Sequence, residues 1–274
     1  MLFCIGTGEP GAPAPAEGGG SVLRLLSNQN FNPTRLIVVS FGAIILLGTF
    51  LLHLPISARD GQFTPWLTCL FTATSATCVT GLVLVDSALH WTPFGQGVIL
   101  AMIQLGGLGF VSLISLIPLL LRRRIGLSQR LAIASAFNLN GMSGVVRVVR
   151  HALMGTFLLE GCGAILLATR FVPLFGWGRG LWYSIFHSVS AFCNAGFDLM
   201  GEHTGAFSSL AGFREDPVVL GTIGCLIVLG GLGFFVWEDC LEHRSWRRLS
   251  FYSRMVLAVT GALILEIGRA SCRE

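Results

Sequence analysis

Two short glycine turns carry the most specific chemistry in this sequence. Their residues are Val79, Thr80, Gly81 and Leu82 in the first turn, and Asn194, Ala195, Gly196 and Phe197 in the second. Glycine adopts a positive φ without steric cost, which lets successive backbone carbonyls point the same way. Carbonyl oxygens arranged in a ring replace the hydration shell of a monovalent cation. We therefore expect the turns to bind a cation through backbone oxygens, with no side-chain site for a transition metal.

Each turn ends a short apolar segment, and the two segments match. Leu70–Leu82 and Ile185–Phe197 align with an offset of 115 residues and share phenylalanine, serine, alanine, cysteine and glycine at the same places. They predict short helices at Trp66–Thr77 and Leu181–Cys193. A helix needs about 20 apolar residues to cross a bilayer, so neither helix spans it. Each helix points the negative end of its dipole at the following turn, which favours cations over anions.

The segments around the turns predict a re-entrant arrangement. Irregular backbone at membrane depth is tolerated only where protein or a water-filled cavity covers it. Longer apolar segments predict full spans, and a loop is expected before the second short helix; the spans are Leu36–Leu54, Phe94–Leu121, Ala152–Thr169 and Val218–Trp237, and the loop is Val172–Gly180. The predicted fold is an all-α membrane protein of repeated transmembrane helix, re-entrant pore loop and transmembrane helix units. The alternative is that the glycine turns are ordinary structural bends.

The composition places the chain in a lipid bilayer. Hydrophobic residues make up 53% of it and charged residues 12%, whereas a soluble domain carries about 25% charge. The net charge of +4 is small and dispersed, which argues against a nucleic-acid partner. The eight cysteines show no CxxC spacing and are interpreted as small buried residues. Because the chain has no phosphate-binding glycine loop, HExxH motif or cluster of catalytic side chains, we do not expect an enzyme.

Arginines in the loops predict the orientation, since they favour the cytoplasmic side. They cluster in residues 122–150 and again in residues 244–254, two spans later. The predicted organisation is a disordered cytoplasmic tail (1–35), a first span–pore loop–span unit (36–121), a basic cytoplasmic linker (122–150), a second unit (151–237), a second cytoplasmic linker (238–254), the truncated start of a third unit (255–265) and a non-native tail (266–274). The tail is so interpreted because an arginine inside a spanning helix costs about 2.5–3.5 kcal/mol on insertion scales.

The motif GGLGF occurs at Gly106–Phe110 and again at Gly230–Phe234, 124 residues later. Together with the matched short helices, it indicates two copies of one unit. Small residues also let membrane helices pack closely. We expect the motif to serve that purpose as well.

Four titratable side chains lie in or near the predicted pore segments, and their roles stay open. Asp86 and Asp198 follow the two turns, where they either concentrate cations at the outer mouth or cap a loop. His187 lies on the second short helix and is interpreted as a packed, hydrogen-bonded histidine rather than a ligand or a proton relay. Glu160 lies inside a predicted span, where a carboxylate is a functional hypothesis by default. It requires a partner on another helix, in either a structural pair or a gating role.

At these residues the chain resembles the Trk/Ktr/HKT superfamily of potassium transporters, and is most similar to the Ktr-type membrane subunit. The first filter and following helix of that family are matched by FTATSATCVTGLVLVDSALHWTPFGQGVILAMIQLGGLGF (Phe71–Phe110), and its second filter by GWGRGLWYSIFHSVSAFCNAGFDL (Gly176–Leu199). The resemblance implies four span–pore loop–span repeats around one pore, a dimer of the complete subunit and a cytoplasmic ring of regulatory subunits. Those subunits would bind the nucleotide, so no cofactor is expected on this chain.

The resemblance implies the pore-forming subunit of a potassium uptake system in a prokaryotic plasma membrane, with its N-terminus in the cytoplasm. The sequence contains two of the four repeats and a fragment of a third, and we expect no conduction by these residues alone. One alternative is a sodium-permeable or ion-coupled cation symporter of the same family. An alternative of another class is a non-conducting membrane fragment that acts only by association.

The filter assignment predicts the effect of one substitution. Family members with serine at the first filter glycine tend to pass sodium, so Gly81→Ser in the complete subunit is expected to weaken the preference for potassium. The ratio of potassium to sodium flux in liposomes measures this. An unchanged ratio would contradict the assignment of Gly81 to the filter.

Overall fold

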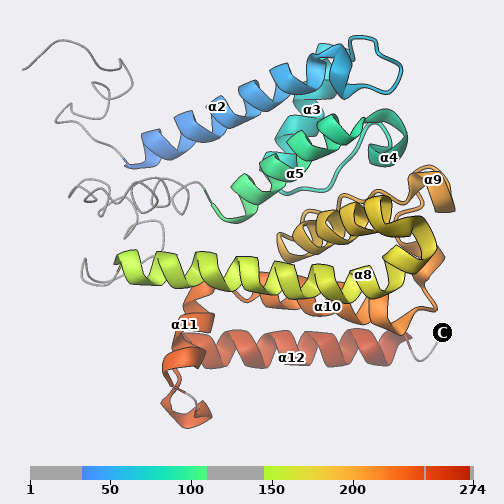
Figure 1. Cartoon of the computed structure of the whole chain (residues 1–274). Helices are drawn as coiled ribbons and strands as arrows, with labels where there is room; N and C mark the ends of the chain where they lie inside the picture. Colours follow the sequence, from blue (N-terminus) through green and yellow to red (C-terminus); the bar gives the residue numbers. More distant parts are fainter. Residues whose placement is uncertain (1–32, 110–144, 244, 272–274) are drawn as a thin grey trace, which may run out of the picture. The chain divides into compact units, whose positions relative to one another are not determined.

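The computed structural model describes residues 33–109, 145–243 and 245–271 of the chain (Figure 1). These residues form helices and connecting loops, and one antiparallel bridge among them joins Ala58 to Trp91. The prediction of an all-α chain is therefore confirmed for this part. Residues 1–32 of the predicted disordered tail (1–35) and residues 122–144 of the predicted basic linker (122–150) lie outside the described residues.

The first helices surround the first glycine turn. They are α2 (Pro33–His53), a short 3-10 turn (Pro55–Ser57), α3 (Trp66–Thr77), α4 (Ser87–His90) and α5 (Pro93–Gly107). Helix α3 has the predicted bounds, and α2, α3 and α5 pack against one another. Thr92 caps α5 by accepting a hydrogen bond from the Gly95 N–H at 3.3 Å, and Pro93 follows at the first helical position, where no N–H is required.

The later helices surround the second glycine turn. They are α8 (Val145–Phe192), α9 (Gly201–Thr204), a 3-10 turn (Ala211–Phe213), α10 (Pro217–Gly231), α11 (Phe234–Glu242), a 3-10 turn (Trp246–Arg248) and α12 (Phe251–Ser271). Helix α8 packs against α10, and α11 packs against α12. Helix α10 has an acidic cap, because the Asp216 carboxylate accepts from the Val218 N–H at 3.0 Å. Helix α12 continues past Leu265, so the predicted tail begins within a helix.

Helix α8 consists of two limbs, and the predicted loop Val172–Gly180 is wrong. The limbs, residues 145–175 and 177–192, are separated by the single non-helical residue Gly176, with φ 79° and ψ 168°. The chain folds back tightly there, because a Cβ on Gly180 would lie 2.6 Å from the carbonyl oxygen of Phe171. Two glycines thus replace the nine-residue loop expected from the sequence. The second short helix is the second limb, which ends one residue before the predicted Cys193.

The GGLGF motifs end helices, which corrects the two spans predicted to run through them. Helix α5 stops at Gly107 and Gly109 has φ 72°; the rest of the span predicted to Leu121 lies outside the described residues. Helix α10 stops at Gly231, Gly233 has φ 84°, and α11 leaves at 90°. An uninterrupted helix over Val218–Trp237 is therefore wrong, because the last glycine of the motif takes a left-handed conformation that ends the helix.

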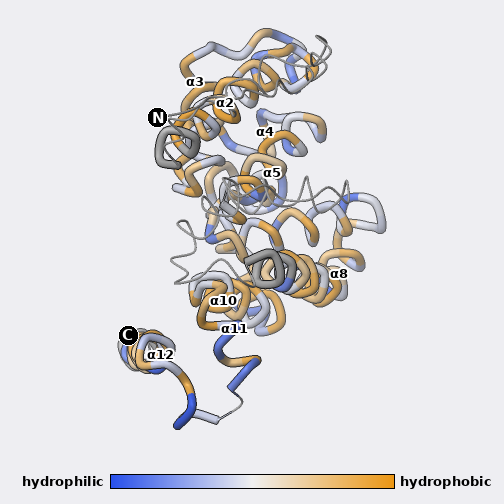
Figure 2. Tube along the Cα trace, turned by 90° about the vertical axis from the view of Figure 1, so that its left-hand side faces the viewer, coloured by the Kyte–Doolittle hydropathy of each residue, from blue (hydrophilic) through white to orange (hydrophobic). Residues whose placement is uncertain are grey.

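Hydrophobic residues recur along these helices (Figure 2). Exposed apolar side chains include Leu46 and Phe50 on α2 and Phe157 and Leu158 on α8, as expected for helices that contact lipid. By length and hydropathy, residues His151–Phe192 are long and apolar enough to cross a membrane, as are α10 and α11 taken together. Hydrophilic residues gather in the connection from α11 to α12.

Asp239 holds the connection between α11 and α12 in place through hydrogen bonds. The Asp239 carboxylate on α11 accepts hydrogen bonds from the Ser250 N–H at 2.9 Å and the Ser250 hydroxyl at 2.7 Å, immediately before α12 begins. Desolvation by burial raises the pKa of Asp239. Hydrogen bonds from Ser253, Ser250 and His243 outweigh this effect and lower the pKa to about 2. Asp239 therefore stays ionised at neutral pH and holds the start of α12 to α11.

Two glycines let the longer helices approach the ends of the short helices. A Cβ on Gly106 would lie 2.0 Å from the Thr77 carbonyl oxygen, and a Cβ on Gly230 would lie 1.8 Å from the Phe192 carbonyl oxygen. Thr77 and Phe192 are the last residues of α3 and α8. The two contacts correspond to each other, because Thr77 and Phe192 are related by the offset of 115 residues and Gly106 and Gly230 by the offset of 124 residues. The expectation that GGLGF allows close helix packing is thus confirmed at its first glycine.

These contacts predict a large difference between two glycines of α10. Gly230→Ala is expected to destabilise the protein by about 1–3 kcal/mol, because the added methyl group overpacks against a backbone oxygen. Gly224→Ala is the matched control, since a Cβ added there would have no atom within 4 Å and alanine favours helix. Thermal unfolding in detergent measures both. Equal melting temperatures for the two variants would refute the packing argument.

Candidate ion filter

The two glycine turns adopt the same backbone conformation. Val79 and Asn194 both have φ 57°, and Gly81 and Gly196 both have φ 74°. The same hydrogen bonds close each turn: the Thr80 N–H donates to the Ser75 carbonyl at 3.0 Å, and the Ala195 N–H donates to the Ser190 carbonyl at 2.8 Å. Two sequences that share one residue in four, VTGL and NAGF, therefore make one kind of turn.

The turns lie directly against each other. A Cβ on Gly81 would lie 2.6 Å from the Ala195 carbonyl oxygen and 3.4 Å from the Gly196 Cα. Glycine is required at position 81 for two reasons, since its positive φ disfavours any side chain and the neighbouring turn occupies the space. Residues 115 positions apart in the chain thus form one continuous patch of backbone.

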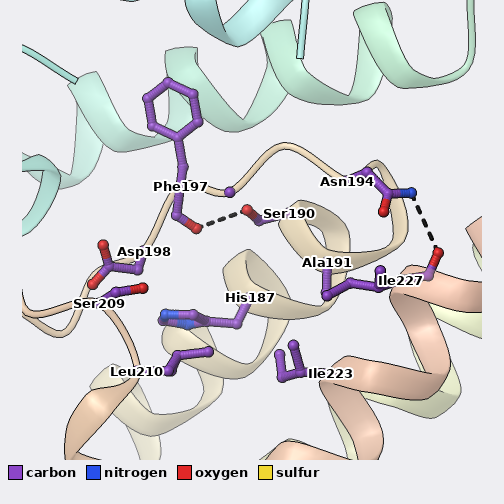
Figure 3. Close-up of a pocket in the computed structure, with 11 residues that line it drawn as sticks. His187, Ser190, Ala191, Asn194, Phe197, Asp198, Ser209, Leu210, Ile223 and Ile227 are labelled. Carbon is purple, nitrogen blue, oxygen red and sulfur yellow. Dashed lines mark hydrogen bonds between the residues drawn. The ribbon is translucent and has the colours of Figure 1, made fainter. Parts of the chain in front are cut away.

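Most carbonyl oxygens of the turns are free of protein donors. Within the part of the chain that the structure describes, no donor binds the carbonyls of residues 79–82 or 194–196. The Phe197 carbonyl differs, because the Ser190 hydroxyl donates to it at 2.7 Å (Figure 3). A backbone carbonyl strongly requires a partner. Seven carbonyls without one are available to water or to a cation.

The first residue of each turn fits its conformation differently. Asparagine tolerates the left-handed region. The Asn194 amide also donates to the Phe192 carbonyl and to the Ile227 carbonyl, each at 3.4 Å, and Figure 3 shows the second of these bonds. A β-branched residue at positive φ is an outlier. Val79 is therefore strained in the first turn, whereas Asn194, at the same place in the second turn, is not.

A pocket of about 250 Å³ lies behind the second turn (Figure 3). His187 lines it and is buried, with Nδ1 placed 2.7 Å from the Tyr183 carbonyl and Nε2 placed 3.3 Å from the Leu199 N–H. These partners require that Nδ1 donates and Nε2 accepts. The packed interpretation of His187 is thus supported, and the histidine braces the chain that leaves the turn.

The two aspartates after the turns bind backbone N–H groups. Asp86 is buried and caps α4, accepting from the N–H groups of Ala88, Leu89 and Phe207 at 2.8, 2.9 and 2.8 Å. Asp198 accepts from the Met200 N–H at 3.1 Å. Burial, and after it the nearby Asp86 carboxylate, raises the pKa of Asp198 against the effect of that hydrogen bond. Capping is therefore the observed role of Asp86, and attraction of cations to the outer mouth stays a prediction.

The structure adds residues that the sequence reasoning missed. Gln104 on α5 is the partner of Glu160, with its Nε2 at 3.0 and 3.1 Å from the two carboxylate oxygens. Gln96 links the same helix to the second limb of α8 by accepting from Trp182 Nε1 at 2.9 Å. The sequence signals these contacts only by placing isolated glutamines in apolar helices. Only the fold shows which partners they face.

An apolar helical chain with two turns of free carbonyls is typical of a membrane protein that transports cations. The family model described as "Cation transport protein" (TrkH) matches residues 26–264 of this chain. The chain belongs to the TrkH family. Since this is a family of transporters, the prediction that the chain is not an enzyme is confirmed.

Named relatives support the same family. The chain is 38% identical to the potassium/sodium uptake protein NtpJ of Enterococcus hirae over 245 residues, which cover 89% of this chain and 53% of the relative. It is 38% identical to the Ktr system potassium uptake protein B of Bacillus subtilis, covering 86% and 51%, and 34% identical to that of Vibrio alginolyticus, covering 84% and 50%. The chain thus spans about half the length of these relatives. The predicted resemblance is confirmed.

The strain at Val79 predicts opposite effects of two substitutions. Val79→Asn is expected to stabilise the protein by about 1 kcal/mol, because asparagine tolerates the left-handed conformation. Asn194→Val is expected to destabilise it by about 2 kcal/mol, since it adds that strain and removes two hydrogen bonds. Thermal unfolding in detergent measures both. If both substitutions shift the melting temperature in the same direction, the two turns are not equivalent.

Proposed function

We propose that this chain is part of the pore-forming subunit of a potassium uptake system. In it, K⁺ crosses the plasma membrane of a prokaryote past the carbonyl oxygens of residues 79–82 and 194–197. The observation that carries this proposal is the pair of matched turns with seven carbonyls free of donors among the described residues. Such oxygens replace the hydration shell of a monovalent cation. The relatives named as potassium uptake proteins support the choice of ion.

The proposed architecture consists of two helix–re-entrant loop–helix units. Helices α5 and α10 each have 15 residues, begin with proline and lie 124 positions apart. The short helix before each turn, α3 or residues 177–192 of α8, has too few residues to cross a bilayer. Both turns then enter from the outside, and the arginine-rich segments and the N-terminus lie in the cytoplasm. This orientation rests on the distribution of arginine.

Further units are needed to complete the pore. Two adjoining turns supply part of a coordination ring, and the relatives are about twice as long as the matched segment. We infer that the complete subunit closes the ring with further repeats and forms a dimer. The name of the Bacillus subtilis relative, a component of a Ktr system, supports a separate regulatory subunit in the cytoplasm, which would bind any nucleotide.

Sodium permeation is the second candidate function. The Enterococcus hirae relative is named a potassium/sodium uptake protein, and it is as similar to this chain as the first Ktr relative. Gly81 supports potassium through the family resemblance, in which serine at this position accompanies sodium passage. A side chain there would also displace the Ala195 carbonyl. A fragment that acts only by association is the alternative without transport.

Uptake by the complete subunit tests the proposal. In a bacterial strain that lacks its own potassium uptake systems, expression of the subunit is expected to restore growth at low potassium. Purified subunit in liposomes should pass K⁺ faster than Na⁺. Equal rates would favour the sodium-permeable alternative, and the absence of flux of either ion would overturn the proposed function.

A further inference from the structure

Glu160 is a buried carboxylate in the first limb of α8, with 5% of its surface exposed. Such a group within a membrane helix is costly and requires a reason for its presence. Gln104 of α5 supplies its polar contact, donating to both carboxylate oxygens. Neither Gln104 nor Glu160 belongs to a glycine turn. Glu160 nevertheless contacts the short helix that leads into the second turn.

The backbone and the side chain of Glu160 both contact the short helix that carries the second turn. The Ser188 hydroxyl donates to the Glu160 carbonyl at 2.6 Å, and Cys193 Sγ lies 4.0 Å from Glu160 Oε1. Cys193 immediately precedes the turn residue Asn194. The last residues before the turn, from Ser188 to Cys193, are therefore held at both ends by one residue of the neighbouring limb.

Helix α5, which belongs to the first unit, packs against the same end of the second short helix. A Cβ on Gly107 would lie 2.4 Å from Cys193 Sγ, so α5 packs directly on the end of the second short helix. Gln104 lies one turn earlier on α5. The contact between Gln104 and Glu160 thus joins α5, which follows the first turn, to the first limb of α8, which in turn contacts the short helix before the second turn.

The described side chains that contact the Glu160 carboxyl group are hydrogen-bond donors. Among the described residues, the two side chains that reach its carboxylate, Gln104 and Cys193, both donate to it. A carboxylate only accepts, whereas a protonated acid also needs an acceptor. A negative charge beside the C-terminal end of a helix is unfavourable for the helix dipole. A cation in the adjoining turn would offset that cost.

We propose that Glu160, held by Gln104, is a positioning residue for the second filter turn and thereby helps to set the affinity and selectivity for K⁺. The proposal rests on the proposed function. It assigns the intramembrane carboxylate to the filter rather than to gating or to stability alone. The Glu160 carboxylate acts through Cys193 and makes no contact with the ion, whereas Ser188 bonds to the backbone carbonyl of the same residue.

Four variants of the complete subunit test this inference in liposome flux assays. Glu160→Ala is expected to raise the potassium concentration at half-maximal flux about tenfold and to lower the K⁺/Na⁺ ratio, since it removes hydrogen bonds to a charged group. Gln104→Glu should be at least as harmful, because it places two carboxylates together. The exchange Glu160→Gln with Gln104→Glu restores one carboxylate–amide pair and should recover most of the selectivity. Glu238→Gln on α11, which removes a carboxylate that contacts His151, is the control and should match the wild type.

A readout without transport keeps the inference separate from the proposed function. The other cysteines of the subunit are first replaced, so that Cys193 is the one thiol left. In this background, Glu160→Ala should speed the reaction of Cys193 with a membrane-permeant maleimide. The exchange Glu160→Gln with Gln104→Glu should slow the reaction again. Absence of flux in the wild type overturns the proposed function, and the labelling rates then decide the inference. Variants with lowered melting temperature but unchanged selectivity and labelling would overturn the inference and leave Glu160 a purely structural residue.

Discussion

Two of the described glycines leave no room for a side chain because each lies against the last carbonyl of a short helix. Gly106 meets Thr77 and Gly230 meets Phe192, at separations that no side chain allows. Each contact fixes where a short helix ends relative to the longer helix behind it. Because the glycine turn begins directly after that end, its position is determined as well. A displacement of either contact would move a turn without changing any residue in it.

The turns themselves depend on left-handed backbone at two positions each. Glycine supplies the second position at no cost, whereas the first is filled by Val79 or Asn194. The Asn194 side chain gains hydrogen bonds in this conformation, whereas the Val79 side chain makes apolar packing contacts instead. Strained backbone persists only where the surroundings impose it. The first turn is thus held in place by its neighbours, which include the second turn.

The sequence predicted the elements whose signals are local. The bounds of α3, the end of the second short helix and the two glycine turns followed from short apolar runs and single glycines. The breaks at Gly176 and Gly233 were missed, because a glycine in an apolar segment fits equally well in a straight helix and at a kink. The partner of Glu160 was also beyond prediction, since residues 56 positions apart meet only through the packing of α5 on α8.

The acidic residues show why local position misleads about electrostatics. Asp86 follows the first turn by four residues, yet three backbone N–H groups surround its carboxylate and leave it little capacity for an ion. Glu160 is 34 residues away from Asn194 in sequence, yet it lies against the residue that precedes that turn. Among the described residues, free carbonyls and the end of a short helix therefore lie at the second turn, and one buried carboxylate contacts the residue before it. In the proposed filter, backbone oxygens would select the ion through their geometry. The residues that position the backbone would then affect selectivity more than charges at the mouth.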